Sequence, residues 1–416
     1  MTSTSFAALS PRAKVPDSQR RRLSKTFTEF FDSEKSSGVL LILCTALSLS
    51  IANSAVGDAY IELWHIPLGG LSVENWINDA LMAVFFLLIG LELERELYVG
   101  ELSDFRNALL PIVGAAGGVA LPALTHFAFN AGTTTQAGMG IPMATDIAFA
   151  LGVLALLGSR VPASLKVFLT ALAVMDDLVA IIVIAVFYTS DLSLAYLLGA
   201  LTVFGFLVAL NRRRVMVLFP YLVGGALMWF LMLESGVHAT IAGVLLAFVI
   251  PFKGRHEYDQ SPSHRLEHLL QRPVAFVILP AFALANTAVI IDAGALQGLA
   301  LKNSLGIIAG LLIGKPLGIS LISFVAVSIG ICRLPADLNW KHICGAGFLG
   351  GIGFTMSIFI TGLAFAGAPD IISSSKIAVL AASVTAGTVG FVWLRLLSQP
   401  VESDEMYPMD FSGPPT

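Results

Sequence analysis

The chain reads Ile141-Pro-Met-Ala-Thr-Asp146-Ile-Ala-Phe149 and then, after a short interval, Leu169-Thr-Ala-Leu-Ala-Val-Met-Asp176-Asp177-Leu-Val-Ala-Ile-Ile-Val183. Both stretches are apolar enough to lie inside a lipid bilayer, yet together they hold three aspartates. An ionised Asp at the centre of a bilayer costs about 2.5 to 3.5 kcal/mol on the scale from insertion experiments. Acids in such positions usually mark an ion or proton pathway. We therefore expect the fold to be organised around these three carboxylates.

The composition is that of a polytopic membrane protein. Of the 416 residues, 56% are hydrophobic and 12% are charged, whereas soluble domains carry about 25% charged residues. Windows of about 20 apolar residues indicate membrane-spanning helices. Twelve such windows occur, at residues 38–56, 76–96, 108–128, 136–158, 163–188, 193–211, 215–233, 236–252, 273–292, 304–330, 343–366 and 374–397. We expect an all-α fold surrounded by lipid, with no nucleic-acid partner.

Polar tails flank the apolar part of the chain. We predict a basic N-terminal tail over residues 1–37, a transmembrane domain over 38–398 and an acidic, disordered tail over 399–416. A signal peptide would have a shorter charged region and a nearby cleavage site, so the first apolar run is expected to be a retained helix. The cysteines have no metal-ligand or disulfide spacing and are expected to be core residues; they are Cys44, Cys332 and Cys344.

Lysine and arginine are segregated between alternate loops. With twelve spans, the loops on one side hold only Lys302 and Lys376. The loops on the other side hold Arg106, Arg160, Lys166, Arg212, Arg213, Arg214, Lys253, Arg255, Arg265, Arg272, Arg333 and Lys341. Because basic loops stay in the cytoplasm, both termini are predicted to be cytoplasmic.

Two of the windows are interrupted by glycine and proline. In the fourth window Gly138, Gly140 and Pro142 precede Asp146, and in the eleventh a series of glycines precedes Phe354-Thr-Met-Ser357. Interruptions free backbone groups that lipid cannot satisfy, so they must line protein or a water-filled cavity. A matched pair, one in each half of the chain, points to a binding site between inverted-topology repeats. The alternative is that glycine is simply common in packed membrane helices.

The consecutive acids Asp176 and Asp177 suit both protons and a hard cation. They lie about 100° apart on a helix, so a cavity reaches one directly and the other obliquely. Carboxylate oxygens bind hard cations such as Na+ or Li+. Burial and mutual repulsion favour the protonated acid, so the pair can release protons when a cation arrives, which is antiport in its simplest form. A structural, hydrogen-bonded Asp pair is the alternative.

Further polar residues accompany the acids. Asp146, next to Thr145, can offset the partial charges of half-helix ends or simply cap one. Lys315 lies deep in an apolar span and is expected to face an acid. Trp64 to Val73, on the external side, has the pattern of a β-hairpin around Gly69-Gly70.

Charged clusters at two helix ends on the cytoplasmic side are candidates for pH sensing, because acid, Arg and His together titrate near neutrality. A solvated, positive-inside helix end is the ordinary alternative. His238 is a further candidate at the external face, although a lone His there is more often structural. The clusters comprise Glu92, Glu94, Arg95 and Glu96 in the first, and Arg265, Glu267 and His268 in the second.

Several motifs together resemble the NhaA-type sodium/proton antiporters of bacterial inner membranes. These motifs are Ala144-Thr-Asp146-Ile-Ala-Phe-Ala-Leu-Gly, Ala173-Val-Met-Asp176-Asp177-Leu, Ser235-Gly-Val-His238-Ala-Thr, Leu312-Ile-Gly-Lys315-Pro-Leu-Gly and Gly351-Ile-Gly-Phe-Thr-Met-Ser-Ile-Phe-Ile. The resemblance covers about residues 30 to 398 and implies an electrogenic, pH-regulated exchanger of Na+ or Li+ for protons, a secondary active transporter without cofactors that serves sodium and pH homeostasis. It further implies two discontinuous, crossing helices and a homodimer formed through the hairpin at residues 64–73.

The resemblance also assigns roles residue by residue. Asp176 and Asp177 match the cation- and proton-binding pair, and Asp146, Thr145 and Lys315 match the charge-compensating residues. The positions linked to pH activation are Glu92, Arg95, Glu96, Glu267 and His268. The chain departs from the family at Glu94, where a basic residue is common, and at Gln271, where a second His often follows.

Two other functions fit parts of the pattern. An intramembrane aspartyl protease also needs two buried acids, but these should come from facing helices; here they are consecutive, and we expect no enzymatic activity. A carrier of an organic anion on a related broken-helix scaffold would favour cationic side chains at its site, whereas this chain offers three acids and one lysine.

Overall fold

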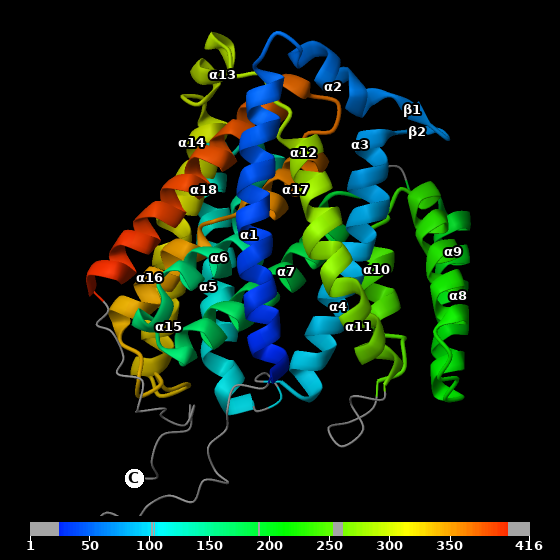
Figure 1. Ribbon diagram of the computed structural model, residues 1–416, viewed down its shortest axis with the longest axis horizontal. Helices are drawn as coiled ribbons and strands as arrows, with labels where there is room; N and C mark the ends of the chain where they lie inside the picture. The colour runs from blue at the N-terminus through cyan, green and yellow to red at the C-terminus, as the bar shows by residue number, and fades with distance from the viewer. Residues whose placement is uncertain (1–24, 101–102, 104, 190–191, 253–260, 398–416) are drawn as a thin grey trace, which may run out of the picture.

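The computed structural model describes residues 25–100, 103, 105–189, 192–252 and 261–397, which form a bundle of helices (Figure 1). The α-helices are α1 (Lys25–Ala52), α2 (Gly57–His65), α3 (Val73–Asn75), α4 (Met82–Tyr98), α5 (Phe105–Asn130), α6 (Ile147–Leu156), α7 (Ala163–Phe187), α8 (Leu194–Arg212), α9 (Phe219–Ser235), α10 (Ile241–Ala247), α11 (Pro262–Pro273), α12 (Leu279–Asn286), α13 (Ala293–Gly298), α14 (Lys302–Ala309), α15 (Lys315–Ser328), α16 (Trp340–Gly350), α17 (Phe354–Ala364) and α18 (Pro369–Leu397).

Short π-helical and 3₁₀ segments continue several of these helices. Three π-helical segments fuse neighbouring α-helices into rods, which run over Val73–Tyr98, Pro262–Asn286 and Lys302–Ser328. These segments are η2 (Trp76–Leu81), η7 (Val274–Ile278) and η8 (Gly310–Gly314), and the 3₁₀ segments are η4 (Gln136–Met143) and η5 (Gly158–Arg160).

Eight helical segments within the described residues are long and apolar enough to cross a bilayer, and the number reaches ten if two bent pairs each count as one span. Each of the twelve expected windows contains a helix. Two of these helices, α9 with 17 residues and α10 with 7, are shorter than a full span. Helix α1 begins at Lys25, so part of the expected tail over residues 1–37 is helical. The acidic tail lies outside the described residues.

The two ends of the bundle differ. At one end, β1 (Pro67–Leu68) and β2 (Leu71–Ser72) pair antiparallel through a turn with positive φ at Gly69 and Gly70, which confirms the expected hairpin. We call this end the hairpin end. Helix α1 begins and α18 finishes toward the opposite end (Figure 1), where Arg160 Nη1 donates to the carbonyl of Arg395. Among the described residues, this second end carries Arg95, Arg160 and Arg395, and it is called the basic end.

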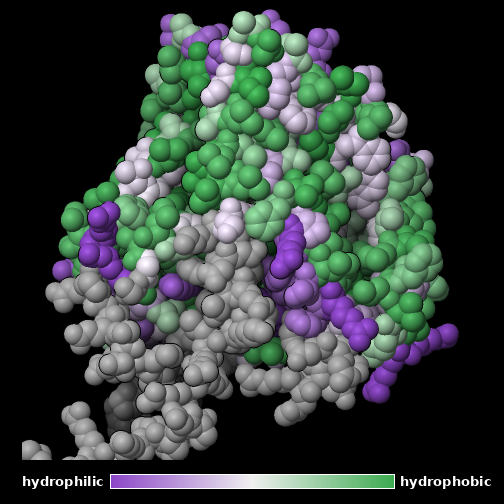
Figure 2. Space-filling model, viewed as in Figure 1, coloured by the Kyte–Doolittle hydropathy of each residue, from purple (hydrophilic) through white to green (hydrophobic). Residues whose placement is uncertain are grey.

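Hydrophobic side chains cover the middle of the face shown in Figure 2, and hydrophilic ones gather toward both ends. This distribution is the one that a bilayer-spanning bundle requires. The main core runs through the helices around α7 and α17. A second cluster joins α8, α9 and α10 to Leu87 and Leu91 of α4, at the side of the bundle.

Helices α5 and α15 are in backbone contact. A Cβ atom on Gly117 would collide with the carbonyl oxygen of Gly318, and a Cβ on Gly318 would collide with that of Gly117. Small residues permit such close approach between membrane helices. The contact fixes α15, which begins with Lys315, against α5.

Both interruptions expected from the sequence are confirmed. The fourth window divides into η4 and α6 around Ala144–Asp146, and the eleventh divides into α16 and α17, bent by 46° at residues 351–353. The glycines that precede each interruption lie within η4 and α16. The chain therefore offers four half-helix ends at two breaks, one in each half of the sequence.

Candidate ion-binding site

The two breaks lie against each other. The backbone N–H of Asp146, in the first break, donates to the carbonyl of Ile352, in the second, over 2.7 Å. Helices η4 and α16 end at this crossing with their carbonyl groups, and α6 and α17 begin there with their N–H groups. Because helix ends carry partial charges of about half an electron, the crossing brings together two negative and two positive ends.

Asp146 accepts hydrogen bonds from both positive helix ends. Its Oδ1 accepts from the backbone N–H of Phe149 (2.9 Å), in the first turn of α6. Its Oδ2 accepts from the backbone N–H (3.0 Å) and the hydroxyl (2.7 Å) of Thr355, at the start of α17. The side chain is buried, so these hydrogen bonds and the two helix ends stabilise its charge in place of water.

Lys315 and Thr145 contact the carbonyl groups at the two negative helix ends. The Lys315 ammonium donates to the carbonyl of Met143, the last residue of η4, and lies 2.7 Å from Asp176 Oδ2. The Thr145 hydroxyl lies 2.6 Å from the same Asp176 oxygen and 2.9 Å from the carbonyl of Gly350, the last residue of α16. A hydroxyl has one proton, so Thr145 donates to one of these acceptors at a time.

The two consecutive acids have different surroundings. Asp176 is balanced by the fully buried Lys315, whereas Asp177 lines a cavity. Within the part of the chain that the structure describes, Oδ1 of each acid is buried without a hydrogen-bond partner. Buried carboxylate oxygens without partners are costly, and they are suitable ligands for a proton or a small cation. The described residues contain no group of three or more His, Cys, Asp or Glu that could hold a metal ion.

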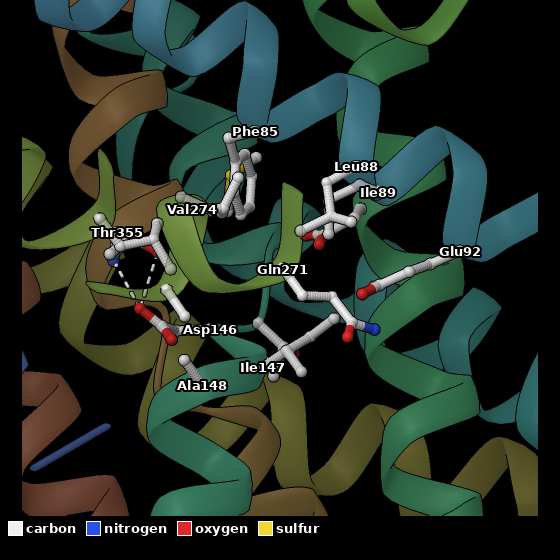
Figure 3. A pocket seen from close by; sticks show the side chains of 15 residues that line it. Phe85, Leu88, Ile89, Glu92, Asp146, Ile147, Ala148, Gln271, Val274 and Thr355 are labelled. Carbon is white, nitrogen blue, oxygen red and sulfur yellow. Dashed lines mark hydrogen bonds between the residues drawn. The ribbon is translucent and has the colours of Figure 1, made fainter. Parts of the chain in front are cut away.

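The cavity leads from the middle of the bundle toward the basic end. It has a volume of about 40 Å³, which is enough for one or a few water molecules or a small cation. In Figure 3, Glu92 and Gln271 point toward each other across it, while Asp146 lies opposite with its two hydrogen bonds to Thr355. Its lining comprises Phe85, Leu88, Ile89, Glu92, Thr145, Asp146, Ile147, Ala148, Asp177, Gln271, Val274, Ala275, Leu279, Thr355 and Met356.

The structure brings together only part of the two expected pH-sensing clusters. Arg95 lies 3.1 Å from both Glu96 and Glu267, so it joins α4 to α11 at the basic end. Glu92 lines the cavity instead. His268 is exposed, with its ring 6.5 Å from that of His264.

Two residues near this cluster carry contacts that the sequence did not indicate. Glu94 is buried and accepts a hydrogen bond from the hydroxyl of Ser263 (3.1 Å). His264 lies 3.9 Å from Glu267 Oε2.

His238 lies away from the basic end. Its Nε2 is 3.6 Å from Asp79, at the start of the rod that contains α4, its Nδ1 is 2.7 Å from the hydroxyl of Thr240, and its ring packs edge-on against Phe359. These contacts fit a structural role.

Thr355 and Ser357 are site residues that sequence reasoning did not assign. Thr355 holds Asp146, and the Ser357 hydroxyl donates to the carbonyl of Ile141 in η4 (2.6 Å). Both are hydroxyl residues directly after the second glycine-rich interruption. Thr145 is a hydroxyl residue in the corresponding place at the first interruption. This correspondence between the two interruptions is the sequence signal that could have identified Thr355 and Ser357.

The chain is similar to known proteins over most of its length. Residues 28–394 match the family model described as Na+/H+ antiporter 1. The chain belongs to the NhaA family of sodium/proton antiporters. It is 70% identical over 379 residues to the Na(+)/H(+) antiporter NhaA of Dechloromonas aromatica, which covers 91% of this chain and 97% of the relative. It is 58% identical to the NhaA of Flavobacterium psychrophilum, over 90% of this chain and 97% of the relative.

A third NhaA relative, from Mesorhizobium japonicum, is 50% identical over 89% of this chain and 94% of its own length. The family match thus includes both interrupted helices, α7 with its acid pair and α15 with Lys315. The expected resemblance to NhaA-type antiporters is confirmed. The matched range begins after the first 27 residues and stops before the acidic tail.

Proposed function

We propose that this protein exchanges Na+ or Li+ for protons across a membrane, with Asp177 as the group that binds either ion. The observation that carries the proposal is the contrast between the two consecutive acids. Asp176 is balanced by Lys315 at 2.7 Å, whereas Asp177 faces the cavity and has a buried oxygen without a hydrogen-bond partner among the described residues.

The proton and the cation, Na+ or Li+, compete for one site. Burial penalises an unbalanced carboxylate, so Asp177 holds either a proton or a cation that has shed part of its water. The buried Oδ1 atoms of Asp176 and Asp177 are candidate ligands for Na+ or Li+, since hard cations favour oxygen donors. A cation that attracts Asp176 weakens its pairing with Lys315, so we expect Lys315 to move when the ion binds.

We further propose that the basic end faces the cytoplasm of a bacterial cell and that the protein lies in the inner membrane. The asymmetry of Lys and Arg supports this orientation. The cavity of Asp177 then lies on the cytoplasmic side, and Na+ leaves the cell as protons enter. If more protons enter than cations leave, the membrane potential contributes about 2.3 kcal/mol per charge and 100 mV.

We assign pH regulation to the cluster around Arg95. This residue links α4 to α11, and both helices also line the cavity through Glu92 and Gln271. The ion pair of Arg95 with Glu267 holds α11 against α4, so a change of charge in this cluster would alter the packing of the two helices around the cavity. Glu94, buried beside Ser263, adds a second acid to the same contact.

We propose a homodimer formed through the hairpin. Its tip residue Leu68 is 61% exposed and pairs with Leu71 across the turn, so the hairpin offers apolar surface and strand edges to a second copy. A Leu68→Cys variant should form a disulfide-linked dimer under mild oxidation in the membrane. Absence of this dimer at native expression levels would contradict the assignment.

The experiment for the exchange uses proteoliposomes with an imposed pH gradient. Addition of Na+ or Li+ should collapse the gradient in the reference protein, and addition of K+ should not. Asp177→Asn should abolish the collapse, because the amide neither binds a proton nor carries charge. The matched control is Asp58→Asn, which changes an exposed acid of α2 at the hairpin end that lines neither cavity.

Failure of every cation to collapse the gradient in the reference protein would refute the proposal and favour a carrier of organic anions. Undiminished exchange in the Asp177→Asn protein would refute the assignment of the site. Thermal unfolding in detergent gives an independent reading. Na+ should raise the unfolding temperature of the reference protein and leave that of the Asp177→Asn protein unchanged, since a ligand stabilises only the state that binds it.

A further inference from the structure

A second and larger cavity lies at the hairpin end. Its volume is about 650 Å³, and it is bounded by α2, α3, the residues that follow α12, α13 and the start of α18. Charged and polar side chains gather in it. They are His65, Glu74, Asp292, Asp370, Ser373, Ser374 and Lys376.

The same two rods line both cavities, one cavity near each end of the bundle. The rod Val73–Tyr98 contributes Glu92 to the cavity of Asp177 and Glu74 to the second cavity. The rod Pro262–Asn286 contributes Gln271 to the first and Ala285 to the second. The opposite walls differ, because α6, α7 and α17 close the first cavity whereas α13 and α18 close the second.

The two rods are joined to each other between the cavities. The Asn286 amide donates to Asn78 Oδ1 over 2.7 Å, and Asn286 is buried. Trp229 of α9 also donates to the carbonyl of Asp79 in the first rod. The rods therefore form a common wall that faces both cavities.

The wall opposite the two rods is formed by α18, and hydrogen bonds connect it to α5 and to the rod Lys302–Ser328. Asn303, at the start of the rod that carries Lys315, donates to Ser375 of α18 over 2.7 Å. The buried His126 of α5 lies 3.0 Å from Asn303 Oδ1. These contacts join α5, α18 and the Lys315 rod next to the second cavity.

Lys376 crosses from one wall to the other. It was expected at a loop, but it lies inside α18 and is only 7% exposed. Its Nζ is 3.7 Å from Glu74 Oε1, and Glu74 Oε2 is 3.6 Å from His65 Nε2. The contact of His65 with Glu74 stays between α2 and α3. The Lys376 contact is thus an ion pair that links the common wall of the rods to the opposite wall, which is hydrogen-bonded to the rod that carries Lys315.

We propose that Glu74 and Lys376 form the gate of the transport path at the hairpin end. The inference rests on the proposed exchange, in which the acid pair must face the two ends in turn. In the present arrangement the cavity of Asp177 lies toward the basic end, and the ion pair holds the two walls together at the hairpin end. When the walls separate there, the pair breaks. Glu74, which keeps its contact with His65, then lacks a lysine partner, and its carboxylate adds to those of Asp292 and Asp370 in attracting cations to the cavity.

The first test measures access and needs no transport. Cys44, Cys332 and Cys344 are replaced by Ser, and the buried cavity residue Ala285 (4% exposed) is changed to Cys. A small, charged, membrane-impermeant thiosulfonate is then added from the hairpin side. Lys376→Met should raise the labelling rate about fivefold, the population shift that loss of a partly exposed ion pair produces.

His65→Ala is the matched control for this test, because it removes a contact of Glu74 within one wall. It should leave the labelling rate within about twofold of the reference, since an exposed His contributes little to such a pair. An unchanged labelling rate in the Lys376→Met protein would overturn the gate.

The second test locks the gate. In the same cysteine-free background, Glu74→Cys/Lys376→Cys is joined by a short, reducible bifunctional thiosulfonate. Cross-linking should abolish Na+-driven collapse of the pH gradient, and reduction should restore it. The control pair, His65→Cys/Glu74→Cys, lies within one wall and should exchange normally when cross-linked. Full exchange in the cross-linked gate pair would overturn the proposal.

The two tests separate this proposal from the one on which it rests. If the reference protein itself does not exchange Na+ for protons, the proposed function fails. The labelling rate of the Ala285→Cys protein then decides by itself whether Glu74 and Lys376 close the cavity. If the reference protein exchanges and the Lys376→Met protein shows no change in access, the gate fails and the exchange stands.

Discussion

Asp146 and Thr355 are joined twice, since one carboxylate oxygen accepts both the backbone N–H (3.0 Å) and the hydroxyl (2.7 Å) of the threonine. These bonds cross from the first break to the second, so they set how α6 and α17 meet. Thr355→Val keeps the shape of the side chain and removes the hydroxyl donor. A hydrogen bond to a charged group is worth about 1.5 to 3 kcal/mol, so the maximal exchange rate should fall about tenfold or more.

Thr355→Ser is the control for this change, because it keeps the hydroxyl and should retain most of the rate. The measurement is the initial rate of Na+-driven collapse of the pH gradient at saturating Na+. Equal rates in the Val and Ser variants would show that the hydroxyl does not contribute.

Lys315 and Asp176 form a fully buried ion pair, so removal of one partner should destabilise the protein. Lys315→Met leaves the Asp176 carboxylate without a counter-ion, at a cost of about 3 to 5 kcal/mol. The double variant Lys315→Met/Asp176→Asn removes both charges and should regain more than half of the lost stability. Thermal unfolding in detergent measures both. The control is Lys302→Met, which changes an exposed lysine at the hairpin end and should unfold at the same temperature as the reference protein. An unchanged unfolding temperature in the Lys315→Met protein would contradict the importance of the buried ion pair.

Gly318 should tolerate no side chain. An added methyl group would collide with the backbone carbonyl of Gly117, which cannot move aside as a flexible side chain would. Gly318→Ala should cost about 1 to 3 kcal/mol of stability or more and lower the unfolding temperature. Gly362→Ala is the matched change in α17, where a Cβ meets nothing within 4 Å. If both variants unfold at the same temperature, α5 and α15 can separate without loss.

Arg95 should hold α4 against α11. Its guanidinium lies 3.1 Å from Glu267 across the two helices, so Arg95→Gln should remove this ion pair and lower the free energy of unfolding by about 1 kcal/mol. Because both helices also line the cavity of Asp177, the maximal exchange rate should fall as well. Thermal unfolding in detergent and the initial rate of exchange measure the two effects. His268→Ala, at an exposed position of α11, should leave both unchanged, and equal effects in the two variants would argue against a specific role of Arg95.

Much of the fold followed from the sequence because its strongest signals are local. The apolar windows and the Gly-Gly hairpin depend on neighbouring residues, and so do the two interruptions. The contact of Lys315 with an acid also followed, since a charge deep in an apolar span needs a partner. Which of the two acids it contacts did not follow, because the 100° between Asp176 and Asp177 fixes only that they differ.

The contacts that could not be predicted join residues far apart in the chain. Glu74 and Lys376 come from opposite ends of the sequence, and Lys376 is near enough to a window boundary to pass for a loop residue. Thr355 was visible as a hydroxyl after a break, but its bond to Asp146 depends on how two breaks cross. The pH-sensing residues were expected in two clusters at cytoplasmic helix ends. The three-dimensional packing instead places Glu92 at a cavity, Arg95 in an ion-pair cluster and His268 on the surface.

The way Asp146 and Lys315 satisfy the four half-helix ends bears on why such an exchanger does not leak. Asp146 offsets the two positive ends, whereas the single charge of Lys315 is shared between the two negative ends and Asp176. The crossing with both acids ionised therefore keeps excess negative charge on the acid pair. Protons or a cation bound to the pair reduce this charge, whereas the empty crossing carries it through a region that stabilises it poorly. We therefore expect the crossing to change sides readily only with an ion bound, which would couple the two ion flows.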